Sequence, residues 1–165
     1  IDQYRAHFRV LYEYFLRRFK EENSTSQKLL FPHPFPINPS TYAALIEIRD
    51  ELYKIGFSID WEKENELLIS GVPSSIEVKD PIMLLQTLAD EWNDGNKTQG
   101  LSTHEKIAFT LANQLAIRKG KTLQQEELDA IIEDLFACDN PNYSPHGKAI
   151  MFKLGLDEIK KRFEK

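Results

Sequence analysis

The run Asn140-Pro141-Asn142-Tyr143-Ser144-Pro145-His146-Gly147-Lys148-Ala149 combines two prolines, a glycine and a histidine within ten residues. Proline locks φ and cannot donate a backbone hydrogen bond, whereas glycine turns where a Cβ would clash. The run therefore predicts a loop of defined shape that carries one polar ring, His146. A lone loop histidine is more often exposed or hydrogen-bonded than catalytic, so composition leaves both a structural loop and a site open.

The composition around this loop is that of an ordinary soluble domain. The chain has 165 residues, of which 41% are hydrophobic and 28% are charged. This size allows a real core and predicts one domain, with two lobes as an option. A net charge of −5 gives no global attraction to nucleic acid. DNA contact would need local basic clusters such as Arg17-Arg18 or Lys160-Lys161-Arg162, which are more often solvated helix faces.

Cysteine usage and hydropathy indicate a cytosolic protein. Cys138 is the single cysteine, which excludes an intrachain disulfide, and no paired Cys/His spacing indicates structural zinc. No apolar run approaches the roughly 20 residues of a membrane span, and the start does not resemble a signal peptide. The chain opens on Ile1 rather than methionine. We therefore expect a fragment with an upstream part missing.

Apolar periodicity predicts alternating helices and strands on both sides of a break at 93–100, which holds two glycines. Asn38-Pro39 and Asp80-Pro81 each place a capping residue before a proline, which predicts a helix start. Ser102 and Thr122 each begin a sequence with the spacing of a capping box, which predicts two more. Alternate prolines from Pro32 predict an edge strand. The expected helices are 4–21, 39–56, 81–92, 103–119, 122–136 and 156–163, with a hairpin over 57–61 and 66–70 and a strand at 150–154.

Several stretches in the same order resemble the C-terminal domain of the MutL family of mismatch-repair proteins. The opening Asp2–Glu13 is similar to a family stretch reading D-Q-H-A, two residues, E, four residues, E. Near the end, Asn140-Pro141 and Ser144–Ala149 resemble the family's C-P-H-G-R-P. Between them, Leu111–Gly120 is similar to a family run that contains an alanine-cysteine pair. The resemblance covers essentially the whole chain.

The resemblance implies an α/β (α+β) fold with two lobes. Residues 1–22 and 98–165 would form an internal dimerisation lobe, and residues 23–97 an inserted external, regulatory lobe that contacts the sliding clamp. The family's domain begins with strands ahead of the D-Q stretch, and these would lie upstream of residue 1. An unrelated α/β protein-interaction domain is the alternative outside this family.

Many members of the family nick DNA with metal ions, and the resemblance carries the ligand positions onto this chain. Histidine and glutamate four residues apart share a helix face, and thiolate and imidazole suit zinc or a similar ion. Here those helix positions are Tyr4 and Phe8. The two cysteine positions are Asn113 and Ser144, and only His146 keeps a ligand type. The sequence therefore predicts a degenerate site without a metal.

Two other motif positions, Asp2 and Glu13, also match and are the remaining candidates for a catalytic role together with His146. Glu13 lies nine residues after Tyr4 and is as easily a solvated helix carboxylate. A site rebuilt from Asp2, His7 and His146 is conceivable. The alternative function is accordingly a residual metal-dependent DNA-nicking endonuclease domain.

The run from Gln27 to Pro32 matches the family's sliding-clamp contact, which reads Q, two residues, L or I, one residue, P. Gln27, Leu30 and Pro32 would make this contact by docking an extended peptide into an apolar groove on the clamp. The plain alternative is an edge strand whose Leu29 and Phe31 face the core.

The resemblance also implies partners and a cellular setting. We expect a homodimer that works with the replicative sliding clamp and the mismatch-recognition protein MutS. DNA would be contacted through the full-length protein, and no membrane is involved. No cofactor is expected in this domain, since ATP and magnesium would bind an absent N-terminal region. The expected location is the bacterial cytoplasm, with nucleoid association during repair.

Overall fold

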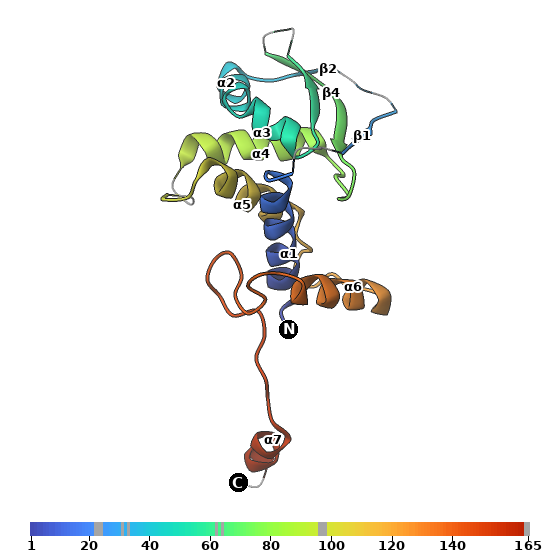
Figure 1. The fold of residues 1–165 in the computed structure, drawn as a ribbon, viewed down its shortest axis with the longest axis vertical. Helices are drawn as coiled ribbons and strands as arrows, with labels where there is room; N and C mark the ends of the chain where they lie inside the picture. Colours follow the sequence, from blue (N-terminus) through green and yellow to red (C-terminus); the bar gives the residue numbers. More distant parts are fainter. Residues whose placement is uncertain are drawn as a thin grey trace. The chain divides into compact units, whose positions relative to one another are not determined.

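In the computed structural model the chain forms two compact units. The structure describes residues 1–21, 25–30, 32, 34–61, 63, 65–95 and 99–163. The first unit joins Ile1–Val10 to Ala116–Lys165, and the second is Leu11–Leu115. Helix α1, Gln3–Arg18, begins in the first unit and ends in the second (Figure 1). The predicted class, a mixture of helices with an antiparallel sheet, is confirmed.

The sheet of the second unit is built around one long strand. β4 pairs antiparallel with the three others, and its Leu68 faces Pro34 on one side and Asp60 on the other. Its Gly71 faces Lys28 and Ser58 in the same way. Two short strands therefore follow each other along one edge of β4, and the third lies along the opposite edge. The strands are β1 (Ser26–Lys28), β2 (Pro34–Pro36), β3 (Ser58–Asp60) and β4 (Glu66–Pro73).

Helices cover one face of this sheet (Figure 1). Residues alternate along β4, so that Leu67 and Ile69 are buried while Glu66 and Leu68 are half-buried on the other face. Buried leucines of the helices, such as Leu45 and Leu85, complete the core. The helices are α2 (Pro39–Glu47), α3 (Arg49–Lys54), α4 (Pro81–Asp94) and α5 (Thr103–Leu115), and α4 packs against both α2 and α5.

The first unit holds a much smaller core. It contains the start of α1, helix α6 (Gln125–Phe136), the loop at 140–150 and helix α7 (Leu156–Phe163). Ala6 of α1, Ile131 and Leu135 of α6, and Ile150 after the loop form its buried cluster. Val10 and Met151 pack partly buried against this cluster.

Most predicted helix starts are confirmed by cap geometry. The Asn38 side chain accepts from Thr41 N at 2.8 Å, and the Asp80 side chain accepts from Met83 N at 2.9 Å. Ser102 and Glu105 form the predicted capping box, with Ser102 N donating to Glu105 Oε2 at 2.9 Å. The hairpin, the proline-rich edge strand and the terminal helix are confirmed as well.

Three local predictions are wrong. The helix expected over 39–56 is broken at Ile48, whose backbone leaves the helical region (φ −110°, ψ 17°) while its side chain is buried. The capping box of helix α6 is formed by Gln124 and Glu127, not by Thr122 as predicted. Gln124 N donates to Glu127 Oε2 at 2.8 Å. No strand forms at 150–154, because the described residues offer that segment no strand to pair with.

The compact units do not share the bounds of the predicted lobes. Their boundaries fall after Val10, inside α1, and after Leu115, at the end of α5, rather than at residues 22 and 98. Both divisions join the two chain ends in one unit. The assignment of dimerisation to one lobe and clamp contact to the other stays a prediction.

Candidate functional site

The loop at residues 143–149 is a tight turn closed by its own backbone. Ser144 N donates to Lys148 O at 2.9 Å, and Gly147 N donates to Ser144 O at 2.8 Å. Gly147 has φ +72°, a conformation that favours glycine. Tyr143 and Ala149 then form an antiparallel bridge where the two arms of the loop meet. The loop therefore has the defined backbone shape that its prolines and glycine predict.

Two arginines of α1 hold both arms of this loop. Arg5 Nη1 donates to Ala149 O at 2.6 Å, and Arg9 Nε donates to Tyr143 O at 2.7 Å. Their spacing of four residues places both guanidinium groups on one helix face. We call this pair the arginine clasp. The sequence analysis did not predict this pair, although two arginines four residues apart in the opening motif indicate two cations on one helix face.

Asp2 lies at the start of α1 and acts there as a helix cap. Its Oδ1 accepts from Arg5 N at 3.0 Å, and its Oδ2 lies 3.3 Å from Arg5 Nε. Its backbone N donates to Ile150 O at 2.8 Å, which joins the helix start to the end of the loop. The observed contacts of Asp2 are therefore structural ones.

Three rings pack together at the positions that the sequence predicts as degenerate ligand positions, with Tyr4 stacked on Phe8 and His146 tilted against Phe8. The Tyr4 and Phe8 centroids are 5.9 Å apart, and the Phe8 and His146 centroids are 5.1 Å apart. Phe8 is fully buried, and His146 covers it from the exposed loop. Burial raises the pKa of the Tyr4 phenol above its ordinary value, while the nearby Arg118 charge lowers it. The ionised phenolate is thus disfavoured here.

Ser144, at a cysteine position of the family motif, is buried and already engaged by the loop. Its Oγ accepts from Lys148 N at 3.3 Å. His7 is also engaged, because its Nδ1 accepts from Ile117 N at 3.1 Å. Burial lowers the pKa of the His7 imidazole; Asp134 opposes this shift and Lys121 adds to it.

The predicted set is divided between the two units. Asp2, Tyr4, Phe8, Ser144 and His146 all lie in the first unit. Glu13 and Asn113 lie in the second unit, Glu13 buried on α1 and Asn113 half-buried on α5. Within the described ranges no group of three or more His, Cys, Asp or Glu side chains could hold a metal ion.

The predicted clamp-contact segment lies at the β1 edge of the sheet. Gln27 is exposed within β1, opposite Val72 of β4, and Leu30 just after it is 89% exposed. Pro32 is exposed as well, whereas Phe31 lies outside the described residues. Leu29 is half-buried, and its N donates to Ser70 O at 2.9 Å. The segment therefore combines a backbone bound to β4 with outward side chains.

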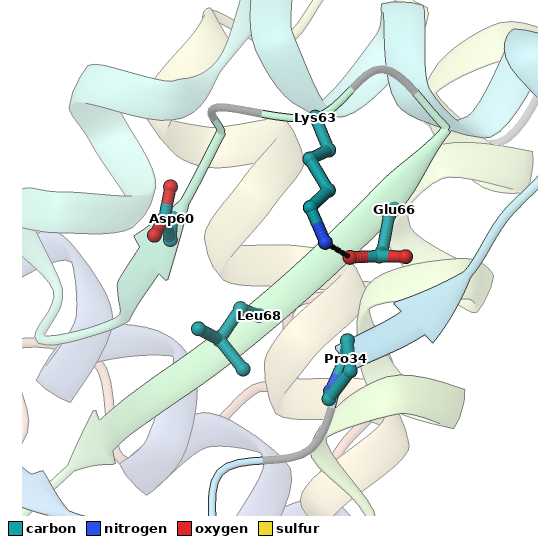
Figure 2. Close-up of a pocket in the computed structure, with 5 residues that line it drawn as sticks. All are labelled: Pro34, Asp60, Lys63, Glu66 and Leu68. Carbon is teal, nitrogen blue, oxygen red and sulfur yellow. Dashed lines mark hydrogen bonds and ion pairs between the residues drawn. The ribbon is translucent and has the colours of Figure 1, made fainter.

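A shallow cavity of about 160 Å³ opens on the outer face of the sheet beside this segment. Figure 2 shows Leu68 at its centre on β4, with Pro34 of β2 and Asp60 of β3 on either side. Lys63 Nζ is 3.0 Å from Glu66 Oε1 at its rim.

The family description of a MutL C-terminal dimerisation domain matches residues 1–123. This chain belongs to that family. The match includes α1 with Tyr4 and Phe8, the clamp-contact segment and the whole second unit.

Curated relatives agree with this assignment along nearly the whole chain. The DNA mismatch repair protein MutL of Christiangramia forsetii is 37% identical over 163 residues, and that of Parabacteroides distasonis is 34% identical over 168 residues. Each alignment covers 99% of this chain but only 26% and 27% of the respective relative. The chain thus spans about a quarter of the length of the MutL proteins it matches. Among the described helices, none combines the length and apolarity needed to cross a bilayer.

Proposed function

We propose that this domain joins two copies of a MutL-type mismatch repair protein and docks the replicative sliding clamp, without cutting DNA itself. Its membership of a dimerisation-domain family carries the first part of this proposal. In the full-length protein the domain would act with the mismatch-recognition protein MutS. ATP, magnesium and DNA would then bind other regions of that longer chain.

The loss of nuclease chemistry rests on what now occupies the ligand positions. Phe8 offers no donor atom and is fully buried, and burial raises the pKa of the Tyr4 phenol, which disfavours the phenolate that would bind a metal. The Ser144 hydroxyl is a poor zinc ligand and already accepts from the loop backbone. The arginine clasp further gives the loop its shape by hydrogen bonds alone. The residues present in the first unit therefore do not fit the family's metal ion.

Metal analysis combined with a nicking assay tests this part. We expect less than stoichiometric zinc or manganese after purification, and no manganese-dependent nicking of supercoiled plasmid. His146→Ala should leave both results unchanged. Stoichiometric metal together with nicking that His146→Ala abolishes would contradict the proposal and establish a residual endonuclease.

The clamp contact rests on the outward position of its side chains. Gln27 and Leu30 are both exposed, so their side chains are accessible to a partner. An exposed amide followed by an exposed apolar plug suits docking of an extended segment into a groove. The apolar floor of the neighbouring cavity at Leu68 adds contact area for the same partner.

Binding to immobilised sliding clamp tests this contact. Gln27→Ala and Leu30→Ala should each weaken binding at least about tenfold, the effect expected for an anchor residue. Met83→Ala is the matched control, because Met83 is an exposed apolar side chain of the same unit on α4. Equal clamp binding by all three variants and the unchanged protein would contradict the proposed contact.

A further inference from the structure

The strand that carries the clamp-contact segment has few contacts of its own to hold it. All three residues of β1 are exposed, so the strand is not anchored by a side chain in the core. Its first residue, Ser26, lies opposite Pro73 of β4, which cannot donate a backbone hydrogen bond. Segments with few buried contacts and exposed backbone bonds open most easily. Contacts outside the strand ladder therefore matter for the position of β1.

Thr25, the residue before β1, receives two hydrogen bonds on its side-chain oxygen. Arg18 Nη2, at the last residue of α1, donates to Thr25 Oγ1 at 3.2 Å. Ser74 Oγ, just after β4, donates to the same oxygen at 3.0 Å, and Ser74 N donates to Thr25 O at 3.4 Å. We call these three residues the threonine anchor. It joins the end of α1 and the end of β4 to the start of β1.

Two glycines allow the chain to pass closely at the threonine anchor. A Cβ added to Gly56, which has φ +103°, would lie 2.7 Å from Thr25 O. A Cβ added to Gly71 of β4 would lie 2.2 Å from Ser26 Oγ, which in turn lies 3.1 Å from Ser58 Oγ of β3. A side chain at either glycine would displace the start of β1. The close approach and the hydrogen bonds thus fix the same short stretch of chain.

We propose that Thr25 is the positioning residue of the clamp contact, and that the clamp binds the segment as it lies on β4. The threonine anchor holds the segment before Gln27, and Leu29 N holds it after Gln27 by donating to Ser70 O at 2.9 Å. A peptide that is already held in its bound form avoids the cost of ordering when it associates. This inference rests on the proposed clamp docking and adds the residue that prepares the segment for it.

Binding kinetics on immobilised sliding clamp, measured with the full-length protein, test this role. Thr25→Val keeps the branched shape of the side chain but removes the oxygen that accepts from Arg18 and Ser74. The segment would then be in its binding form less often, so the association rate should fall at least about threefold while the dissociation rate stays unchanged. Leu30→Ala, which removes a direct contact, should instead raise the dissociation rate. Thr25→Ser keeps the oxygen and should bind as the unaltered protein does.

Thr87→Val is the matched control for Thr25→Val. Thr87 Oγ1 donates to Met83 O within α4 of the same unit, so its loss should change neither rate. Hydrogen exchange gives a second readout, because the Leu29 amide is bound to β4. This amide should exchange faster in Thr25→Val and at the original rate in Thr87→Val.

An unchanged association rate in Thr25→Val would overturn the positioning role. A faster dissociation rate would also overturn it, since Thr25 would then contact the clamp directly. Tighter binding would overturn it as well, because the segment would then have to leave β4 to reach the clamp. If Leu30→Ala binds the clamp as the unaltered protein does, the proposed clamp docking itself is contradicted.

Discussion

The two compact units use their large apolar residues in opposite ways. The second unit places most of them in its own core, and among its described residues only Leu30, Tyr53 and Met83 are strongly exposed. The first unit buries a small cluster around Leu135 and leaves seven large apolar side chains exposed: Ile1, Phe136, Tyr143, Phe152, Leu154, Leu156 and Phe163. The second unit therefore encloses its core among the described residues, whereas the first leaves a group of large apolar side chains at its surface.

This contrast agrees with the division of labour that we propose. A self-contained unit can offer a small exposed motif without losing stability, because Leu30 contributes nothing to its core. A unit with a small core gains stability when a second copy covers it, since binding to the folded form shifts the folding equilibrium. Dimerisation and folding of the first unit should thus be linked.

The largest effect is expected from Phe8→Ala in the first unit. Removing this fully buried ring should lower the free energy of unfolding by about 3–5 kcal/mol, measured by urea denaturation. His146→Ala is the control, because it removes only the exposed ring of the same stack and should cost less than about 1.5 kcal/mol. Equal costs for both would mean that the stack does not support the unit as described.

Leu85→Ala tests the completeness of the second unit. Leu85 is fully buried on α4, so its truncation should cost about 2–5 kcal/mol. Met83→Ala on the same helix should stay within about 0.5 kcal/mol, since Met83 is exposed. The loss from Leu85→Ala should not depend on protein concentration. A cost that grows on dilution would show that this unit also depends on a partner.

The arginine clasp should have an intermediate effect. Arg9→Met keeps much of the side-chain volume but removes the donor to Tyr143 O, which should cost about 1.5–3 kcal/mol in chemical denaturation. Arg17→Met on the exposed face of α1 should be nearly neutral. An equally small effect of both would mean that the loop keeps its shape without the clasp.

The pH dependence should be the smallest effect. Because the pKa of His7 is lowered in the folded state, the unfolded chain binds the proton first, and stability falls as the pH drops below about 6.5. One group can contribute at most about 1.4 kcal/mol per pH unit. His7→Asn keeps an acceptor for Ile117 N but cannot titrate, so its stability curve should be flatter than that of the unaltered chain. Parallel curves would assign the acid sensitivity to other groups.

Local chemistry made several elements predictable. Asn38 before a proline and Ser102 before Glu105 predict helix starts, because their side chains cap the helix. The capping hydrogen bonds join residues less than four positions apart. The edge strand with alternate prolines was predictable for the same reason, because proline restricts its own backbone and donates no bond. Of the candidate site, the replacement of the family's ligands by Tyr4, Phe8 and Ser144 stays a prediction from the residue types.

What sequence reasoning missed depends on residues far apart in the chain. The arginine clasp joins Arg5 and Arg9 to carbonyl groups more than 130 positions away. Residues 150–154 have the composition of a strand but form none, because no strand among the described residues pairs with this segment. A strand exists only where another backbone pairs with it.

The sequence by itself determined most of the helix starts and the family of the chain, because both depend on short runs of residue types. The tertiary structure alone decided that the His146 ring packs tilted against Phe8, that two arginines bind the loop, and that the described part of one unit encloses its core while the other leaves apolar side chains exposed. Those outcomes depend on burial and on long-range hydrogen bonds, which arise only when the distant parts of the chain have met.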